Sequence, residues 1–319
     1  MAAMDLRKAR IHLIVHEPGI RRTVRDLLRM IGVDDVILGS KFEDIRIAIT
    51  ENRPDLIILG SNFPDGNVPA LIKDLRHNQL GKDPFLPIII LTPEATEELV
   101  STVADSGSDD LLVYPLSPAH LRTRIEALVE KRKPFVVTRD YIGPDRRGVG
   151  SFEQGPMEVP LIEVPNTLRA TVKGDMSKME LDAAIAASLR TVNHQRLDRS
   201  GYQISWLIER IVAGYETKTG GILEPKAADF LRQLTRTGEE TAKRITGTEF
   251  EHVSYLCETL ISVSERMLAA GTSADETDKA LLPELGSAFK TAFIVTDDDN
   301  ISKKIRDTLK NRQPRRLDN

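Results

Sequence analysis

Side chains that could do chemistry lie just after short apolar runs in the first half of the sequence. They are His16 and Glu17, Ser61 and Asp65, and Thr92. An imidazole changes charge near neutral pH, and carboxylates bind hard cations such as Mg²⁺. If the runs are parallel strands, their carboxyl ends meet at the edge where open α/β sheets carry their sites. The chemistry to consider at that edge is cation binding and proton or phosphoryl transfer.

The elements that must position these side chains form an alternating pattern between residues 9 and 132. Short runs rich in Ile, Leu and Val are typical of strands buried on both faces. The runs are Ile11–Val15, Val36–Leu38, Leu56–Leu59, Ile88–Leu91 and Leu111–Val113. Amphipathic segments of helical spacing separate them, and Ser117 with Pro118 is predicted to begin the last helix. The pattern predicts a doubly wound, five-stranded parallel sheet with helices on both faces.

Four stretches and their spacing resemble the response-regulator receiver domain, which has a flavodoxin-like topology. They are "ARIHLIVHEPGIR", "PDLIILGSNFPDG", "PIIILTPEATEE" and "ADSGSDDLLVYPLSPAHLRTRIEALV". The resemblance covers residues 9–132. It implies phosphoryl transfer to an aspartate after the third strand. In the family, two acids after the first strand hold Mg²⁺ together with that aspartate, and a Thr or Ser and a Lys contact the phosphoryl oxygens.

Carried over residue by residue, the resemblance points to five positions of this sequence. The acid pair falls on Val15 and His16, the acceptor on Gly60, the hydroxyl on Thr92 and the lysine on Tyr114. Four of these positions lack the side chain that the chemistry requires, because Gly60 has no oxygen to phosphorylate and Tyr114 carries no positive charge at neutral pH. The sequence therefore predicts a degenerate, phosphorylation-incompetent pseudo-receiver that needs no metal or cofactor.

Neighbouring side chains are poor substitutes for the missing ones. We expect capping, turn or solvent-exposed roles for Glu17 and Asp65. Ser61 should point away from the pocket, because successive strand residues face opposite sides. An exposed loop position is the favoured interpretation of His16, with a pH sensor as the alternative. Tyr114 is expected to fill the space left by the lysine and the metal, or to act as a fixed version of the aromatic switch of receivers.

Composition is that of a soluble protein. Its 319 residues suffice for two domains, with 40% hydrophobic and 29% charged residues and a net charge of −4. Apolar runs stay well below the ~18 residues that span a bilayer, and the first residues do not resemble a signal peptide. The single cysteine, Cys257, excludes a disulfide framework. We expect a cytoplasmic location and no membrane insertion.

The predicted organisation is a receiver-like domain (1–133), a Pro/Gly-rich linker (134–175), an all-α helical domain (176–311) and a basic tail (312–319). In the linker, Arg139, Arg146 and Arg147 surround a Gly-Pro-Asp turn and are candidates for contact with an anion or an acidic partner. A solvated turn docked through Tyr141 is the favoured alternative.

Helical patterns fill most of the region from residue 176 onward, and we expect a bundle or hairpin array. Separate helices are predicted at 179–192 and around 204–215, followed by others from 225, at 249–269, at 281–293 and at 301–309. His194 is a weak candidate for phosphotransfer, since lone helical histidines are usually surface or partly buried residues. Cys257 lies on an apolar stripe and is expected in the core.

The sequence favours a bacterial signalling adaptor or scaffold that is not an enzyme. Its partners would be proteins of a signalling pathway, bound through the helical protein-interaction or dimerisation domain, with a homodimer as one arrangement. Nucleic acid is not expected as a partner, because the net charge is negative and no recognition-helix pattern is evident. The alternative is a DNA-binding transcription regulator with an unrecognised helical output domain.

Overall fold

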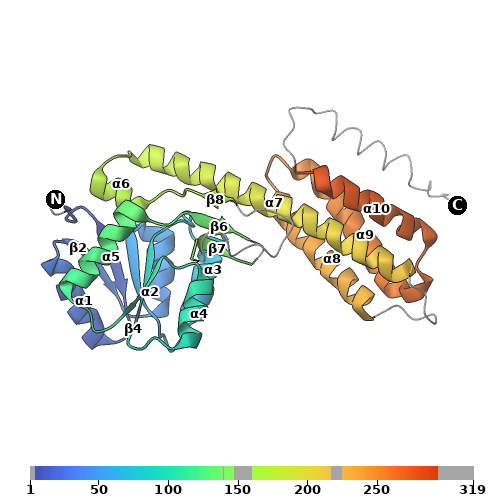
Figure 1. The fold of residues 1–319 in the computed structure, drawn as a ribbon. Coiled ribbons are helices and arrows are strands. Elements are labelled where there is room, and N and C mark those ends of the chain that lie inside the picture. Colours follow the sequence, from blue (N-terminus) through green and yellow to red (C-terminus); the bar gives the residue numbers. More distant parts are fainter. Residues whose placement is uncertain (1–3, 139, 147–159, 217–224, 294–319) are drawn as a thin grey trace. The chain divides into compact units, whose positions relative to one another are not determined.

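The computed structural model describes residues 4–138, 140–146, 160–216 and 225–293 (Figure 1). The chain divides into two compact units, Met1–Val192 and Asn193–Asn319. This division lies beyond the boundary at residue 176 that the sequence suggested. The reason is that the residues after the receiver-like region pack back onto it and belong to the first unit. The predicted helix at 301–309 and the basic tail lie outside the described residues.

A five-stranded parallel sheet forms the centre of the first unit, in the order β2-β1-β3-β4-β5. The strands are β1 (Arg10–Ile14), β2 (Asp35–Gly39), β3 (Leu56–Gly60), β4 (Ile88–Thr92) and β5 (Asp110–Val113). Every residue of β3 and β4 is buried, as near-continuous apolar runs require. The predicted doubly wound sheet is thus confirmed, each strand within one residue of its predicted ends.

Helices cover both faces of this sheet (Figure 1). They are α1 (Pro18–Met30), α2 (Phe42–Ile47) with a π-helical continuation η1 (Ala48–Asn52), α3 (Val68–Arg76), α4 (Glu97–Ser106) and α5 (Pro118–Lys131). Helices α1 and α5 share one apolar core with alternate strand residues, and α2, α3 and α4 share the other. The Ser117 side chain accepts a hydrogen bond from His120 N, which confirms the predicted start of α5.

The segment predicted as an extended linker contains regular structure. It forms β6 (Phe135–Val137), β7 (Ile142–Pro144), β8 (Leu161–Ile162) and α6 (Thr167–Lys173). The strands make an antiparallel sheet in the order β7-β6-β8, and every residue of β6 is buried. Helix α6 packs on α5 and places Leu168 in the receiver core. Prolines and glycines dominated the sequence pattern, and strands this short leave little periodicity to detect.

A buried ionic network fixes this segment to the receiver. The Asp109 carboxylate accepts hydrogen bonds from Arg76 Nη2 (3.1 Å) and Arg132 Nε (2.7 Å), and the Asp109 and Arg76 side chains are at most 1% exposed. The Phe135 ring stacks against both cations, at 5.3 Å from the Arg76 guanidinium carbon and 5.1 Å from that of Arg132. Arg76 also donates to the carbonyls of Gly107, Pro84 and Leu86. Burial lowers the pKa of Arg76 to about 10, which leaves it charged at neutral pH.

The second unit is built from long helices. They are α7 (Lys178–Glu216), which begins in the first unit, α8 (Pro225–Ile245), α9 (Ser254–Ala270) and α10 (Glu276–Thr291), with short 3-10 turns η2 (Glu251–Val253) and η3 (Gly271–Ser273). Two helices were predicted where α7 runs continuously for 39 residues. The polar stretch between the two apolar patterns has no proline to end a helix, and Gly201 is accommodated inside it.

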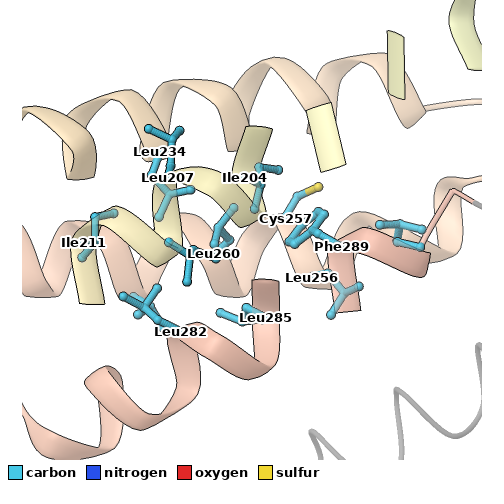
Figure 2. Packing of buried hydrophobic residues seen from close by; sticks show 14 of the residues in the cluster. Ile204, Leu207, Ile211, Leu234, Leu256, Cys257, Leu260, Leu282, Leu285 and Phe289 are labelled. Atoms are coloured by element: carbon cyan, nitrogen blue, oxygen red, sulfur yellow. The ribbon is translucent and has the colours of Figure 1, made fainter. Parts of the chain in front are cut away.

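The core of the second unit contains side chains from all four long helices. Figure 2 shows Leu207 of α7, Leu234 of α8, Leu260 of α9 and Leu285 of α10 within one cluster. Cys257 is fully buried there, as predicted, and burial raises the pKa of its thiol to about 12. Helices α7 and α10 approach closely at Gly201, where an added Cβ would lie 2.5 Å from the Phe289 carbonyl oxygen.

His12 is a polar residue in the middle of β1 that faces the core. Its side chain is 2% exposed, and Nε2 has no hydrogen-bond partner among the described residues. Burial lowers its pKa below the ordinary 6.5. The unfolded chain therefore takes up the proton more readily than the folded one, so stability is lost as the pH falls below 6.5.

We expect His12→Leu to stabilise the first unit by about 1 kcal/mol above pH 6.5, because a buried polar atom without a partner is removed. The gain should grow below pH 6.5, where only the wild-type chain loses stability through His12. Urea unfolding at about one pH unit above and below that value measures both effects. The variant His12→Gln should flatten the pH dependence without the gain, because the buried polar group remains. Equal pH dependence of all three proteins would contradict the assignment.

Candidate functional site

The five positions identified by the family resemblance meet at the carboxyl edge of the sheet. Val15 follows β1, Gly60 ends β3, Thr92 ends β4 and Tyr114 follows β5. In the sheet register, Gly60 pairs with Leu91, and Thr92 pairs with Val113. The ends of β3 and β4 are therefore offset by one residue along the sheet. Parallel strands place these residues together even though about one hundred positions separate Val15 from Tyr114 in the sequence.

Val15 lies against the position where the family carries its phosphate acceptor. It is 1% exposed, and a Cβ added to Gly60 would lie 3.4 Å from Val15 Cγ1. The side chain next to Gly60 is therefore apolar, whereas the family has a carboxylate at the position of Val15. An acidic side chain at Gly60 would have no second acid beside it at Val15, so the residues present do not fit a magnesium ion.

Thr92 keeps its hydroxyl, which is fully engaged within the site. Its Oγ1 donates to the Glu94 carbonyl (2.7 Å) and accepts from Ser61 Oγ (3.2 Å) and the Glu94 amide (3.3 Å). The expectation that Ser61 points away from the pocket was wrong. Strand β3 ends at Gly60, so the alternation of side chains no longer holds at Ser61.

An arginine that the sequence analysis missed lies beside the loop after β1. Arg21 Nη1 donates to the carbonyl oxygens of Val15 (2.5 Å) and His16 (3.1 Å). His16 is exposed, its Nδ1 lies 3.3 Å from the Ser40 carbonyl, and its ring is 6.3 Å from that of Phe63. The Arg21 guanidinium thus binds the backbone carbonyls of the loop after β1, where the family carries its acid pair. No motif marked Arg21, which is one of several arginines in α1.

Tyr114 occupies the position of the family lysine. It is half-buried, packs against the apolar core under α1 and α5, and its amide donates to the Thr92 carbonyl (2.7 Å). Within residues 4–138, 140–146, 160–216 and 225–293, no group of three His, Cys, Asp or Glu side chains could hold a metal ion. The edge offers the hydroxyls of Ser61 and Thr92, the imidazole of His16 and the aromatic ring of Tyr114.

Of the other candidates from the sequence, Arg146 belongs to the first unit and His194 to the second. Arg146 Nη2 donates to the carbonyl (2.5 Å) and the hydroxyl (3.1 Å) of Ser108. Arg139 and Arg147 lie outside the described residues. His194 lies in α7, where its Nδ1 is 3.1 Å from Asp198 Oδ2 and its ring is 5.3 Å from that of Phe250.

The strand order and the positions at its carboxyl edge define a receiver-type, doubly wound domain. Residues 11–126 match the model of the family described as the response regulator receiver domain. This part of the chain is a response-regulator receiver domain, and it is followed by a helical region that the matched residues do not include.

Curated relatives share the receiver part of the chain. The phosphate regulon transcriptional regulatory protein PhoB of Escherichia coli (strain K12) is 31% identical over 128 residues, which cover 40% of this chain and 55% of PhoB. The transcriptional regulatory protein PrrA of Mycobacterium tuberculosis is 29% identical over 168 residues, or 51% of this chain and 64% of PrrA. The chain spans roughly half to two thirds of the length of these relatives.

Solved structures of response regulators and chemotaxis proteins also align with part of this chain. The response regulator DrrB of Thermotoga maritima is 21% identical, with 41% of this chain and 56% of DrrB covered and a TM-score of 0.34. The chemotaxis protein CheY4 of Vibrio cholerae is 24% identical, with 37% of this chain and 96% of CheY4 covered and a TM-score of 0.33.

The names of the relatives bear on the expected partners of this protein. The relatives include proteins named as transcriptional regulatory proteins, and one is named a DNA-binding response regulator, MtrA of Mycolicibacterium smegmatis. The expectation that nucleic acid is not a partner therefore has no support from them. Among the described helices, none is both long and apolar enough to cross a membrane.

Proposed function

We propose that this protein is a bacterial, cytoplasmic signalling adaptor whose receiver domain works without aspartyl phosphorylation. The observation that carries the proposal is the contact between Gly60 and Val15, at the place where the family has its acceptor and an acid. Tyr114 supports it, because an aromatic ring stands where a lysine would neutralise the phosphoryl group. The receiver would act through its constitutive surface, which partner proteins recognise.

In this proposal the helical unit is a module for protein interaction or dimerisation. Tyr202 and Trp206 of α7 are each 46% exposed, which is unusual for large aromatic side chains. The Trp206 ring meets that of Phe230 edge to face at 5.7 Å and lies 5.3 Å from the Arg210 guanidinium carbon. Aromatic and arginine side chains of this kind are enriched in protein interfaces. Tyr202 and Trp206 are therefore the proposed anchors for a partner or a second copy.

Phosphorylation is tested directly by incubating the full chain with acetyl phosphate and Mg²⁺. We expect the intact mass to stay unchanged, because no aspartate occupies the acceptor position. A receiver domain that retains all five family residues serves as the positive control under the same conditions. A stoichiometric, acid-labile phosphate mapped to an aspartate of residues 11–126 would refute the proposal.

A DNA-binding transcription regulator is the second candidate, favoured by the names of the relatives. Its output would be the helical unit, since the receiver family model matches residues 11–126 and none of the helical unit. Fluorescence anisotropy with duplex DNA distinguishes the two candidates. Binding that persists at physiological ionic strength and weakens as salt rises supports the regulator. Failure to bind DNA even at low salt removes it.

A further inference from the structure

A cavity of about 580 Å³ lies in the first unit, at the amino-terminal edge of the sheet and so opposite the degenerate phosphorylation site. One wall comes from the receiver, through residues near the starts of β1, β3 and β4 and through η1. The other wall comes from α6 and the first part of α7. The volume falls in the range of small-molecule sites.

The apolar part of the cavity is contributed by both walls. Ile49 and Leu86 come from the receiver and are at least nine-tenths buried, as is Ile185 of α7. Leu181 and Leu189 lie one turn either side of Ile185 on the same helix and are partly buried. This spacing directs a continuous apolar stripe of α7 into the cavity. An apolar body of several carbon atoms can lie along it.

Two cations at the cavity are not neutralised by the protein. Arg53 of the lining pairs with Asp182 (2.9 Å), whereas Lys82 and Lys178 are exposed and have no ion-pair partner among the described residues. They come from opposite walls, Lys82 from the loop before β4 and Lys178 from the start of α7.

The acidic side chains of the lining are already engaged. Asp55 accepts hydrogen bonds from the Arg10 amide (2.8 Å) and from Thr171 Oγ1 (2.7 Å), and Asp83 accepts one from the Phe85 amide (2.9 Å). Burial raises the pKa of both carboxyl groups. Arg10, the remaining cation of the lining, pairs with Asp35 (2.8 Å). Among the described residues of the lining, the cations outside an ion pair are therefore the two lysines.

We propose that this cavity binds an amphipathic carboxylate of the medium-chain fatty acid type, with its chain on the apolar stripe of α7 and its head group at Lys82 and Lys178. The combination of an apolar floor with two unpaired cations is the basis of this assignment. Helix α7 lines the cavity and continues to Glu216, so the ligand would contact the same helix that contributes to the second unit.

Isothermal titration calorimetry of the full chain with decanoate, below its micelle concentration, tests the proposal. We expect saturable binding of one decanoate per chain. The double variant Lys82→Glu/Lys178→Glu should weaken it at least about tenfold, because two charge-assisted contacts become repulsive. Replacing the exposed, cavity-lining Ala186 with phenylalanine should weaken it comparably by filling the space. The control Lys131→Glu, on α5 outside the cavity, should bind like the wild type.

Decyltrimethylammonium has the same chain with a cationic head and separates charge recognition from general adhesion. We expect it to bind at least about tenfold more weakly than decanoate. The proposal is overturned if decanoate does not bind, if both amphiphiles bind equally, or if the lysine and Ala186 variants bind decanoate as tightly as the wild type. Circular dichroism of each variant shows whether it retains the fold, and Lys82→Arg/Lys178→Arg should restore binding.

Discussion

Replacing Asp109 with asparagine is expected to destabilise the first unit by about 3–5 kcal/mol. The Asp109 side chain is 1% exposed and is the carboxylate shared by Arg76 and Arg132, which are 0% and 5% exposed. Asparagine keeps the shape of aspartate but leaves two buried guanidinium groups without the carboxylate to which both are hydrogen-bonded. The amide of Ile88, which donates to Asp109 Oδ2 at 2.8 Å, would also lose a charged acceptor at the start of β4.

The neighbouring residue provides a matched control for this experiment. Asp110 also pairs with an arginine, through Arg124 Nε at 2.5 Å, but that arginine side chain is 43% exposed. Water can therefore solvate Arg124 when the carboxylate is removed, and Asp110→Asn should cost only about 1 kcal/mol. Hydrogen exchange of β3 and β4 amides reports the first unit, and that of α9 amides reports the second. Equal losses for the two variants would contradict the role assigned to the buried network.

Replacing Phe135 with alanine is expected to destabilise the first unit by about 3–5 kcal/mol, through the cavity that it leaves. The ring is fully buried, meets Phe85 edge to face at 5.8 Å and covers the guanidinium groups of Arg76 and Arg132. Its removal would expose these cations to an empty space while Asp109 still pairs with them. The effect should therefore concentrate on β6 and on the strands paired with it.

Phe135→Leu separates the two contributions of the ring. Leucine retains most of the apolar volume but cannot stack against a cation or against Phe85, so we expect a smaller loss of about 1–2 kcal/mol. Hydrogen exchange of the β6 and β7 amides measures the local effect, and urea unfolding measures the stability of the unit. Rapid exchange in β6 with an unchanged unfolding midpoint would show that the segment is not part of the cooperative unit, against the expectation.

Local pattern determined much of the receiver domain. The five apolar runs are short, rich in β-branched residues and separated by helical spacing, so each strand could be placed from its neighbours alone. The sequences on either side of Gly60, "PDLIIL" and "NFPDG", align it with the phosphate-acceptor position of the receiver family. The same resemblance assigns Val15, His16 and Tyr114 to the other positions of that site. Parallel strands necessarily bring their carboxyl ends together, which is why these distant residues could be assigned to one edge.

Tertiary structure decided the features that depend on contacts between distant residues. The Ser61 side chain points toward Thr92 because β3 ends at Gly60. Arg21 reaches the backbone carbonyls after β1 because α1 packs beside that loop. Strands β6 to β8 form where the Phe135 ring packs against the guanidinium groups of Arg76 and Arg132, which share the Asp109 carboxylate. Arg76 and Asp109 lie 59 and 26 positions before Phe135, and no motif links them to it.

The same distinction explains the cavity and the long helix. Lys82 and Lys178 are ninety-six positions apart in the sequence, and their place at one cavity follows only from the packing of α6 and α7 on the receiver. By local propensity a glycine weakens a helix, but the close approach of α7 and α10 leaves no room for a Cβ at Gly201. Periodicity along the chain records which faces of an element are buried. It does not record what those faces are buried against, and that is what tertiary structure supplies.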